Sequence, residues 1–171
     1  MGYSLWLEDK KTGQMCRRKK PEVDLGNMLC IGGSDLMEFN ITYNYRRYYH
    51  DTKGFEKDGI LTIYGLTGKE SLPLLKRLAK DIENNFKKNG KWITTRVKQR
   101  IPYCCGKELS LAEALLIINT DAKVEYVEKT IERDEGSDED YWEPTAKNAL
   151  KAVQSLIKMA EECPEGIWNG D

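Results

Sequence analysis

The segment on which the fold depends reads EFNITYNYRRYYH and covers Glu38–His50. In its first half apolar side chains alternate with polar ones, which is the period of a strand with one buried face. From Tyr45 onward the period changes, because Tyr45, Tyr48 and Tyr49 are spaced as neighbours on one side of a helix. We therefore expect a half-buried strand that passes directly into a short aromatic helix.

Two interpretations of the aromatic part remain open from the sequence. The tyrosines can form core while the arginines point outward, which is the usual meaning of an aromatic stripe at helical spacing. Alternatively, the rings can stack on a base while the guanidinium groups hold a phosphate, as in a binder of a small nucleotide signal. The candidate ligand-binding residues are Tyr43, Tyr45, Arg46, Arg47, Tyr48 and His50.

An amphipathic helix is expected after this segment. Thr67 and Glu70 have the spacing of a capping box, which is typical of a helix N-terminus. Pro73 has no N–H and would remove a hydrogen bond from the interior of a helix that starts directly after Thr67. We therefore place the start of this helix near Ser71 and its end near Lys87.

The clearest helix in the sequence is Ala146–Glu162. Thr145 precedes it as a candidate N-cap and Pro164 follows it, so the sequence indicates where both ends lie. Its apolar stripe comprises Ala149, Leu150, Val153, Leu156, Ile157 and Ala160. Ile167 and Trp168 are expected to fold back onto its last turn.

The N-terminus is expected to form a hairpin. Tyr3–Glu8 alternates as a strand, and after a polar turn Gln14–Arg17 can return as a second strand. The basic run Arg17–Lys20 is interpreted as a solvated edge that blocks unwanted strand pairing. Gly32-Gly33 is interpreted as a plain turn, because no nucleotide-binding pattern follows it.

The middle of the chain predicts further strands and one helix. Trp92–Ile101 is rich in β-branched and basic residues and predicts a strand that Pro102 ends. Ser110 and Glu113 have the spacing of a capping box, which predicts a short helix, Leu111–Ile118. Val124–Arg133 fits strand alternation slightly better than helical spacing.

Composition limits the class of protein. Of the 171 residues, 40% are hydrophobic and 32% are charged, so one domain with a packed core and a charged surface is expected. No long apolar run and no secretory leader is recognisable, which predicts neither a membrane-spanning nor an exported protein. Five cysteines at irregular spacing, an odd number, predict free thiols in a reducing compartment.

Charge is unevenly distributed along the chain. Residues 108–171 carry 6 Lys/Arg and 16 Asp/Glu, a net charge of −10, whereas residues 1–107 carry 21 and 12, a net charge of +9. Either the two halves pack together and cancel, or they present charged surfaces to a partner. The candidate partner-binding residues are Asp134, Glu135, Asp138, Glu139 and Asp140 in the acidic part, with Arg96, Lys98 and Arg100 in the basic part.

The sequence offers little for catalysis or metal binding. Cys104 and Cys105 are adjacent, but no second cysteine pair stands at the spacing of a zinc site. His50 is the only histidine, and no nucleophile or orienting carboxylate can be assigned to it. We therefore expect a protein without enzyme activity, cofactor or metal.

Several segments together resemble a group of small uncharacterised proteins encoded by phages and prophages. The segments are MGYSL at Met1–Leu5, ITYNY at Ile41–Tyr45, GILTIYGLTGKESLPLL at Gly59–Leu75, DYWEPTAKNALKAV at Asp140–Val153 and PEGIWNGD at Pro164–Asp171. None of them is a catalytic signature and the group carries no assigned activity, so the resemblance implies no functional residue. Related chains pass from the Pro73 helix to the DYW segment in a few residues, whereas here residues 84–139 form an insertion.

The expected architecture is α+β. An N-terminal antiparallel sheet is expected to be packed by the two main helices, with an inserted α/β lobe. Residues 1–83 would supply the sheet and the first main helix, residues 84–139 the lobe, and residues 140–171 the helix that completes the first domain.

The expected function follows from the phage resemblance and the charge distribution. We expect a non-enzymatic phage protein in the cytoplasm of the bacterial host that binds and inhibits a host defence protein, as anti-CRISPR proteins do. The expected mode is occupation of the nucleic-acid-binding surface of the host protein, for which a nucleic-acid-binding nuclease is a candidate, and direct binding to nucleic acid or membrane is not expected. The alternatives are the nucleotide-signal binder described above and a structural phage accessory protein.

Overall fold

The structure, a computed structural model, describes residues 2–17, 36–117 and 123–171. The chain is α+β and divides into two compact units, one formed by Met1–Ile93 with Glu135–Asp171 and the other by Thr94–Asp134. The sequence placed these divisions after residues 83 and 139. The turn expected at Gly32-Gly33 and the basic run beyond Arg17 lie outside the described residues.

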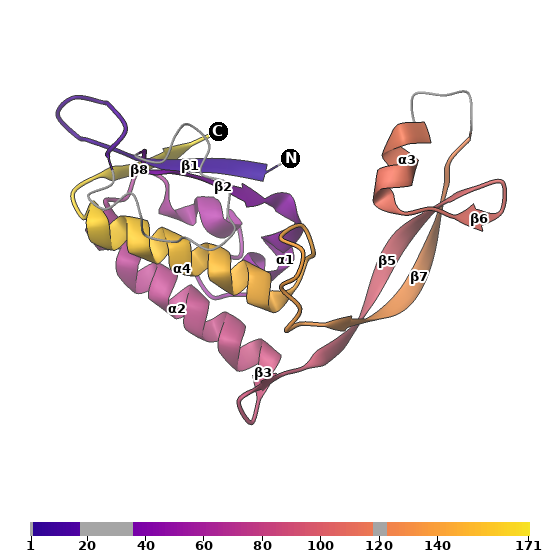
Figure 1. Cartoon of the computed structure of the whole chain (residues 1–171). Helices are drawn as coiled ribbons and strands as arrows, with labels where there is room; N and C mark the ends of the chain where they lie inside the picture. Colours follow the sequence, from indigo (N-terminus) through magenta and orange to yellow (C-terminus); the bar gives the residue numbers. More distant parts are fainter. Residues whose placement is uncertain (1, 18–35, 118–122) are drawn as a thin grey trace. The chain divides into compact units, whose positions relative to one another are not determined.

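The first unit contains a three-stranded antiparallel sheet whose central strand is the N-terminal one. β1 (Gly2–Glu8) lies between β2 (Glu38–Thr42) and β8 (Ile167–Gly170) (Figure 1). Leu5 and Leu7, on one face of β1, are fully buried, as strand alternation predicted.

Two predictions about the edges of this sheet are wrong. The chain does return antiparallel to β1, where the Cys16 amide donates to the Leu7 carbonyl at 2.7 Å, but Gln14–Arg17 is not a second strand because it makes only isolated bridges through Met15 and Arg17. The chain end takes a place beside β1 instead, so Trp168 joins the sheet rather than the last turn of the preceding helix. Burial of the Trp168 side chain favours this arrangement, since its indole is 1% exposed there.

The strand-to-helix change within Glu38–His50 is confirmed. β2 passes into a 3₁₀ turn, η1 (Tyr43–Tyr45), and then into α1 (Arg46–His50). The Thr42 hydroxyl accepts a hydrogen bond from the Asn44 amide at 3.3 Å, which caps the turn. The side chains of Tyr45, Tyr48 and Tyr49 are buried.

The first long helix begins earlier than the sequence predicted. α2 spans Gly68–Phe86, its capping box at Thr67 is complete, and Pro73 lies inside the helix. The chain end explains the early start: the amides of Gly68 and Lys69 donate at 2.8 Å to the carbonyls of Gly166 and Pro164. These bonds satisfy the free N–H groups of the first turn, so the helix forms despite the proline.

The second long helix, α4, spans Ala146–Glu162 as predicted, with Thr145 as its N-cap. α2 and α4 lie side by side beneath the sheet, and a 3₁₀ turn, η2 (Gly59–Ile63), and a short hairpin of β3 (Lys87–Lys88) and β4 (Lys91–Trp92) complete this unit (Figure 1). The apolar stripe of α4 is buried, except for Ile157, which is half-buried. No helix within the described ranges is both long enough and apolar enough to cross a membrane.

The second unit is built on a long two-stranded ribbon. β5 (Thr94–Cys104) pairs with β7 (Glu125–Asp134) over ten residues, and short β6 (Lys107–Glu108) pairs with the other edge of β5. α3 (Leu111–Ile117) contacts β5, and its predicted capping box between Ser110 and Glu113 is present.

Pro102 does not end β5, contrary to the prediction. Its carbonyl accepts from the Leu109 amide at 2.9 Å, on the side of β6. Because the N and O atoms of a paired residue point to the same side of an antiparallel strand, the missing donor also faces this side. β6 is only two residues long and ends before this point, so the ladder to β7 continues through the proline.

Candidate protein-binding surface

The segment between β7 and α4 is anchored on β2 by Tyr141. The Tyr141 hydroxyl donates to the Asn40 carbonyl at 2.7 Å and accepts from the Thr42 amide at 3.3 Å. The buried Tyr45 hydroxyl donates to the carbonyl of Tyr141, and the rings of these two residues pack edge to face. Three hydrogen bonds therefore hold this segment against the strand-to-helix segment Glu38–His50.

Trp142 follows directly and points into solvent. Its amide donates to the Asp140 carboxylate at 2.9 Å, its carbonyl accepts from the Asn44 amide side chain at 2.8 Å, and its ring is 46% exposed. Tyr43, next to Asn44, is 44% exposed. We call the exposed residues Tyr43, Asn44, Glu139, Asp140 and Trp142 the Trp142 surface.

The Trp142 surface contains residue types that are enriched in protein interfaces. Exposed Trp and Tyr side chains supply large contact areas with little conformational entropy to lose. The Asp140 carbonyl also accepts from Glu143 and Asn148, so the turn that presents Trp142 is fixed on both sides. A preorganised turn lowers the cost of ordering on binding.

The acidic block does not form one surface, which corrects the sequence hypothesis. Glu139 and Asp140 are exposed, whereas Glu135 is fully buried. Asp138 accepts from Lys147 at 3.0 Å and Lys151 at 2.5 Å, and these hydrogen bonds hold the pKa of its carboxyl below the usual value. Asp134 is the last residue of β7 and belongs to the other unit.

Glu135 is a structural residue that joins α1 to the start of α4. Its carboxylate accepts from Arg47 at 2.5 Å, from the Tyr48 hydroxyl at 2.7 Å and from the Ala146 amide at 2.9 Å. The Ala146 contact places a negative charge at the positive end of the α4 dipole. Burial, followed by the hydrogen bond to Glu135, raises the pKa of Tyr48 above its usual value.

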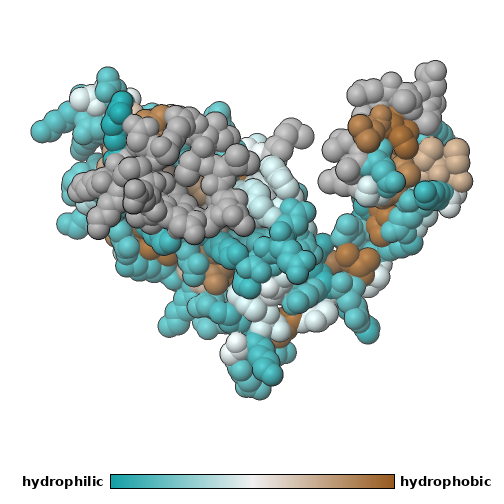
Figure 2. Space-filling model, viewed as in Figure 1, coloured by the Kyte–Doolittle hydropathy of each residue, from teal (hydrophilic) through white to brown (hydrophobic). Residues whose placement is uncertain are grey.

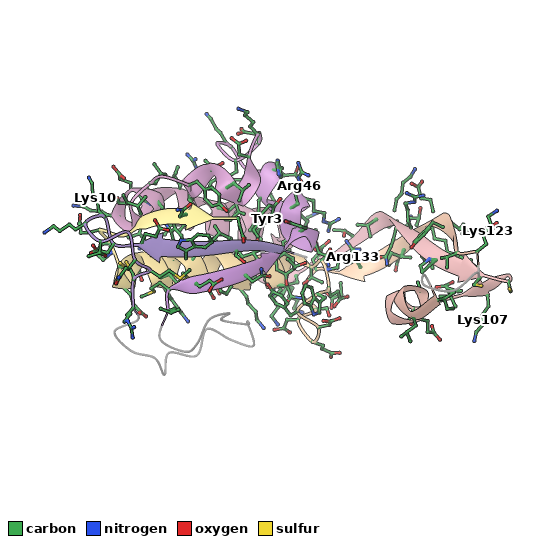
Figure 3. The ribbon with its side chains drawn as sticks, turned by 90° about the horizontal axis from the view of Figure 1, so that it is seen from above. Tyr3, Lys10, Arg46, Lys107, Lys123 and Arg133 are labelled. Atoms are coloured by element: carbon green, nitrogen blue, oxygen red, sulfur yellow. The ribbon has the colours of Figure 1, made fainter. Side chains whose placement is uncertain are left out.

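The alternative ligand site is not assembled. Tyr45 and Tyr48 are core residues, so their rings cannot stack on a base. Arg47 is 36% exposed and is engaged by Glu135. Arg46 is exposed on the outside of α1 and donates to His50 Nε2 at 3.1 Å (Figure 3).

His50 has a structural position as well. Its Nδ1 lies 2.8 Å from the Glu56 carbonyl and its Nε2 accepts from Arg46 at 3.1 Å, so both ring nitrogens have partners within the protein. Gly59, with φ of 55°, passes so close that an added Cβ would lie 2.7 Å from Nε2. The ring therefore spaces α1 from η2 instead of facing a ligand.

The three candidate basic residues of β5 all contact the strand beside them, and two of them form ion pairs with it. Arg96 lies 3.5 Å from Glu132 and Lys98 lies 2.9 Å from Glu128, while Arg100 lies over the ring of Tyr126 at 5.5 Å. These acids come from the acidic half of the sequence. Within this unit, acidic residues from the second half of the sequence therefore offset basic residues from the first half.

The four described cysteines are free. The Cys104 and Cys105 sulfurs lie 3.8 Å apart, and no group of metal-ligating side chains occurs within the described ranges. Cys16 lies in hydrogen-bond contact with Cys163, and together they line a surface hollow of about 370 Å³. Burial and the Cys163 thiol raise the pKa of Cys16 to about 12.

Cys16 is therefore expected to react slowly with alkylating reagents. The thiolate is the reactive species, and a thiol with this pKa remains protonated at pH 8. Iodoacetamide should modify Cys16 at least about tenfold more slowly than exposed Cys105, measured by peptide mass spectrometry. The difference should vanish in denaturant, and equal rates in the folded protein would contradict the raised pKa of the half-buried Cys16 thiol.

Comparison of the chain with protein-family models, with curated proteins and with solved structures gives no match. The Trp142 surface is therefore described from the exposure and hydrogen bonds of its residues alone. Sequence reasoning missed Trp142 and Tyr141, although a usable signal was present. Two adjacent aromatic residues stand inside an acidic, proline-ended loop, where no hydrophobic periodicity requires them.

Proposed function

We propose that this protein is a non-enzymatic phage protein that binds a bacterial defence protein and inhibits it, in the manner of anti-CRISPR proteins. The observation that supports this most strongly is the Trp142 surface. Its aromatic side chains are exposed although the turn beneath them is held by hydrogen bonds to Asn44, Asn148 and Asp140. Aromatic anchors in the centre of an interface contribute most of its binding energy.

The partner surface is proposed to be basic with an apolar pocket. Glu139 and Asp140 lie beside Trp142 and offer two carboxylates that no long helix or strand covers. Such charges favour association with Lys/Arg-rich surfaces, including those that hold nucleic acid. The ring of Trp142 would then enter the pocket, and occupation of that surface would exclude the nucleic acid.

This mechanism is narrower than the one that the sequence suggested. Glu135 is buried, Asp138 is held by two lysines, and Arg96 and Lys98 of β5 are paired with glutamates. Charge steering therefore depends on two residues, so we expect it to change association rates modestly. The apolar anchor supplies most of the affinity.

The test has two steps: capture of the partner, and measurement of its binding to the Trp142→Ala variant. Partners are captured from a bacterial lysate, identified by mass spectrometry and purified, and their activity is measured with and without the protein. Trp142→Ala is expected to weaken binding at least about thirtyfold, the loss typical of a hot-spot tryptophan. It should leave stability within about 0.5 kcal/mol, because the side chain lies at the surface.

The charge contribution is tested separately. Glu139→Gln with Asp140→Asn should slow association severalfold at low salt and much less near 0.5 M salt, because Debye screening removes the long-range attraction. Asparagine keeps the oxygen that accepts from the Trp142 amide. Glu161→Gln with Glu165→Gln, two exposed acids at the far end of α4, is the matched control. A captured partner that binds Trp142→Ala as tightly as the parent would overturn the proposal.

A further inference from the structure

β7 is an edge strand of unusual length and exposure. In the strand order β6-β5-β7, no other strand of the described residues lies beside the outer side of β7 (Glu125–Asp134). Val127 is 45% exposed and Tyr126 47% exposed, and Figure 2 shows hydrophobic side chains at the surface of this unit. The backbone N–H and C=O groups of such an edge are a ready template for another strand.

The two faces of the ribbon follow from the pairing register. Glu125, Val127, Lys129, Ile131 and Arg133 share one face, because alternate residues of a strand point to the same side. On this face Val127 lies opposite Ile101 and Ile131 opposite Val97, which forms an apolar stripe across both strands. The other face carries the ion pairs of Arg96 and Lys98.

The sequence of β7 is complementary to itself when two copies run antiparallel with Lys129 at the centre. Glu125 of each copy then lies opposite Arg133 of the other, and Val127 opposite Ile131. On the second face Glu128 faces Thr130. Two-fold symmetry makes every such contact twice, so the interface contains two ionic and two apolar cross-strand pairs.

Two neighbouring registers also place the same face of both strands on the same side, but their cross-strand side-chain pairs are unfavourable. With Thr130 at the centre, Glu128 lies opposite Glu132 and Val127 opposite Arg133. With Glu128 at the centre, the two copies of Glu128 face each other and Val127 faces Lys129. Glu128 and Glu132 are paired with Lys98 and Arg96 within their own chain, so the apolar mismatch decides against both registers: Val127 gains little from a charged partner. Of these three registers, only the one centred on Lys129 pairs acid with base and apolar with apolar.

The central lysine is already neutralised within its own chain. Lys129 Nζ lies 2.7 Å from the Glu108 carboxylate and 5.0 Å from the centre of the Tyr103 ring. Glu108 lies on β6, so the lysine side chain extends back across β5 and away from the free edge. The two lysines at the symmetry axis therefore do not repel each other as free charges would.

We propose that β7 pairs antiparallel with β7 of a second copy of this chain, which joins the two three-stranded sheets into one continuous sheet. The contact is isologous, since each residue pair occurs twice about the axis. It rests on the edge and the self-complementary register and is independent of the Trp142 surface. Because the paired segment is short, the dimer should dissociate at roughly micromolar or higher concentration.

The charge pairs provide a test of the register. Sedimentation velocity of the full chain over about 1–500 µM should show a reversible monomer–dimer equilibrium. Glu125→Arg alone, or Arg133→Glu alone, places like charges opposite each other at two points and should weaken the dimer at least about tenfold. An equimolar mixture of the two variants restores opposite charges at both points, so a heterodimer should form as tightly as the parent dimer.

The controls separate this contact from general effects of charge. Lys107→Glu reverses an exposed charge on β6, at the opposite edge of the sheet, and should leave the dimer unchanged (Lys107 and Arg133 are labelled in Figure 3). Circular dichroism checks that each variant is folded. A parent protein that sediments as a monomer over the whole range, or a mixture that associates no better than either variant alone, would refute the β7 dimer.

Discussion

Replacing Glu135 by alanine is expected to lower the free energy of unfolding by about 3–5 kcal/mol. The carboxylate is fully buried and accepts from three donors: the Arg47 guanidinium, the Tyr48 hydroxyl and the Ala146 amide. Its removal leaves the Ala146 amide without this acceptor and the half-buried Arg47 without its partner charge. It also removes the negative charge from the N-terminus of α4.

Tryptophan fluorescence is a suitable measurement for this prediction. All four tryptophans, Trp6, Trp92, Trp142 and Trp168, belong to the unit that contains Glu135, so urea titration followed by fluorescence reports on that unit. Glu139→Ala removes an exposed acid four residues away and should change stability by less than about 0.5 kcal/mol. A loss below about 1 kcal/mol for Glu135→Ala would mean that the carboxylate is solvated.

A double-mutant cycle with Arg47 identifies the origin of the loss. Arg47→Ala should also destabilise, although less, because its side chain is 36% exposed and part of its charge is solvated. The coupling free energy between the two sites is expected to be about 1–3 kcal/mol. The sequence interpretation, in which both arginines of α1 simply point outward, would predict no coupling at all.

The sequence predicted the local features of the first unit well, because they depend on periodicity and capping. The change from strand to helix follows from the change in apolar spacing after Thr42, whose hydroxyl caps the turn at Tyr43. The bounds of α4 follow from its apolar stripe and from Thr145 as its N-cap. The role of Glu135 does not follow from such patterns. Its neighbours in sequence are acidic and polar, and its burial depends on Arg47 and Tyr48, which are far away along the chain.

Errors in the prediction occur where distant segments compete with local preference. Pro73 predicted a late start of α2. The helix starts earlier because the carbonyls of Pro164 and Gly166 accept hydrogen bonds from the amides of its first turn. Gly68 contributes through its lack of a side chain, since an added Cβ would lie 2.5 Å from the Cys163 carbonyl oxygen. The start of α2 and the turn after α4 thus fit each other closely, which neither segment indicates by itself.

Trp168 is expected to be the second critical residue of the first unit. Its ring is 1% exposed, and Trp168→Ala should lower the free energy of unfolding by about 3–5 kcal/mol, the cost of a large buried cavity. The indole N–H donates to the Ser71 hydroxyl at 2.8 Å, and that hydroxyl donates to the Gly68 carbonyl at 2.8 Å. The side chain therefore ties the sheet to the first turn of α2.

Two variants separate the contributions of volume and hydrogen bonding at this position. Trp168→Phe keeps most of the buried ring but loses the donor to Ser71, so a smaller loss of about 1–2 kcal/mol is expected. Trp142→Ala, in the same unit and 46% exposed, is the matched control and should leave stability nearly unchanged. If Trp168→Phe proved as destabilising as Trp168→Ala, the bond to Ser71 would outweigh the cavity. Near-native stability of Trp168→Ala would instead mean that β8 is not part of the folded sheet, and that α2 keeps its early start without the chain end.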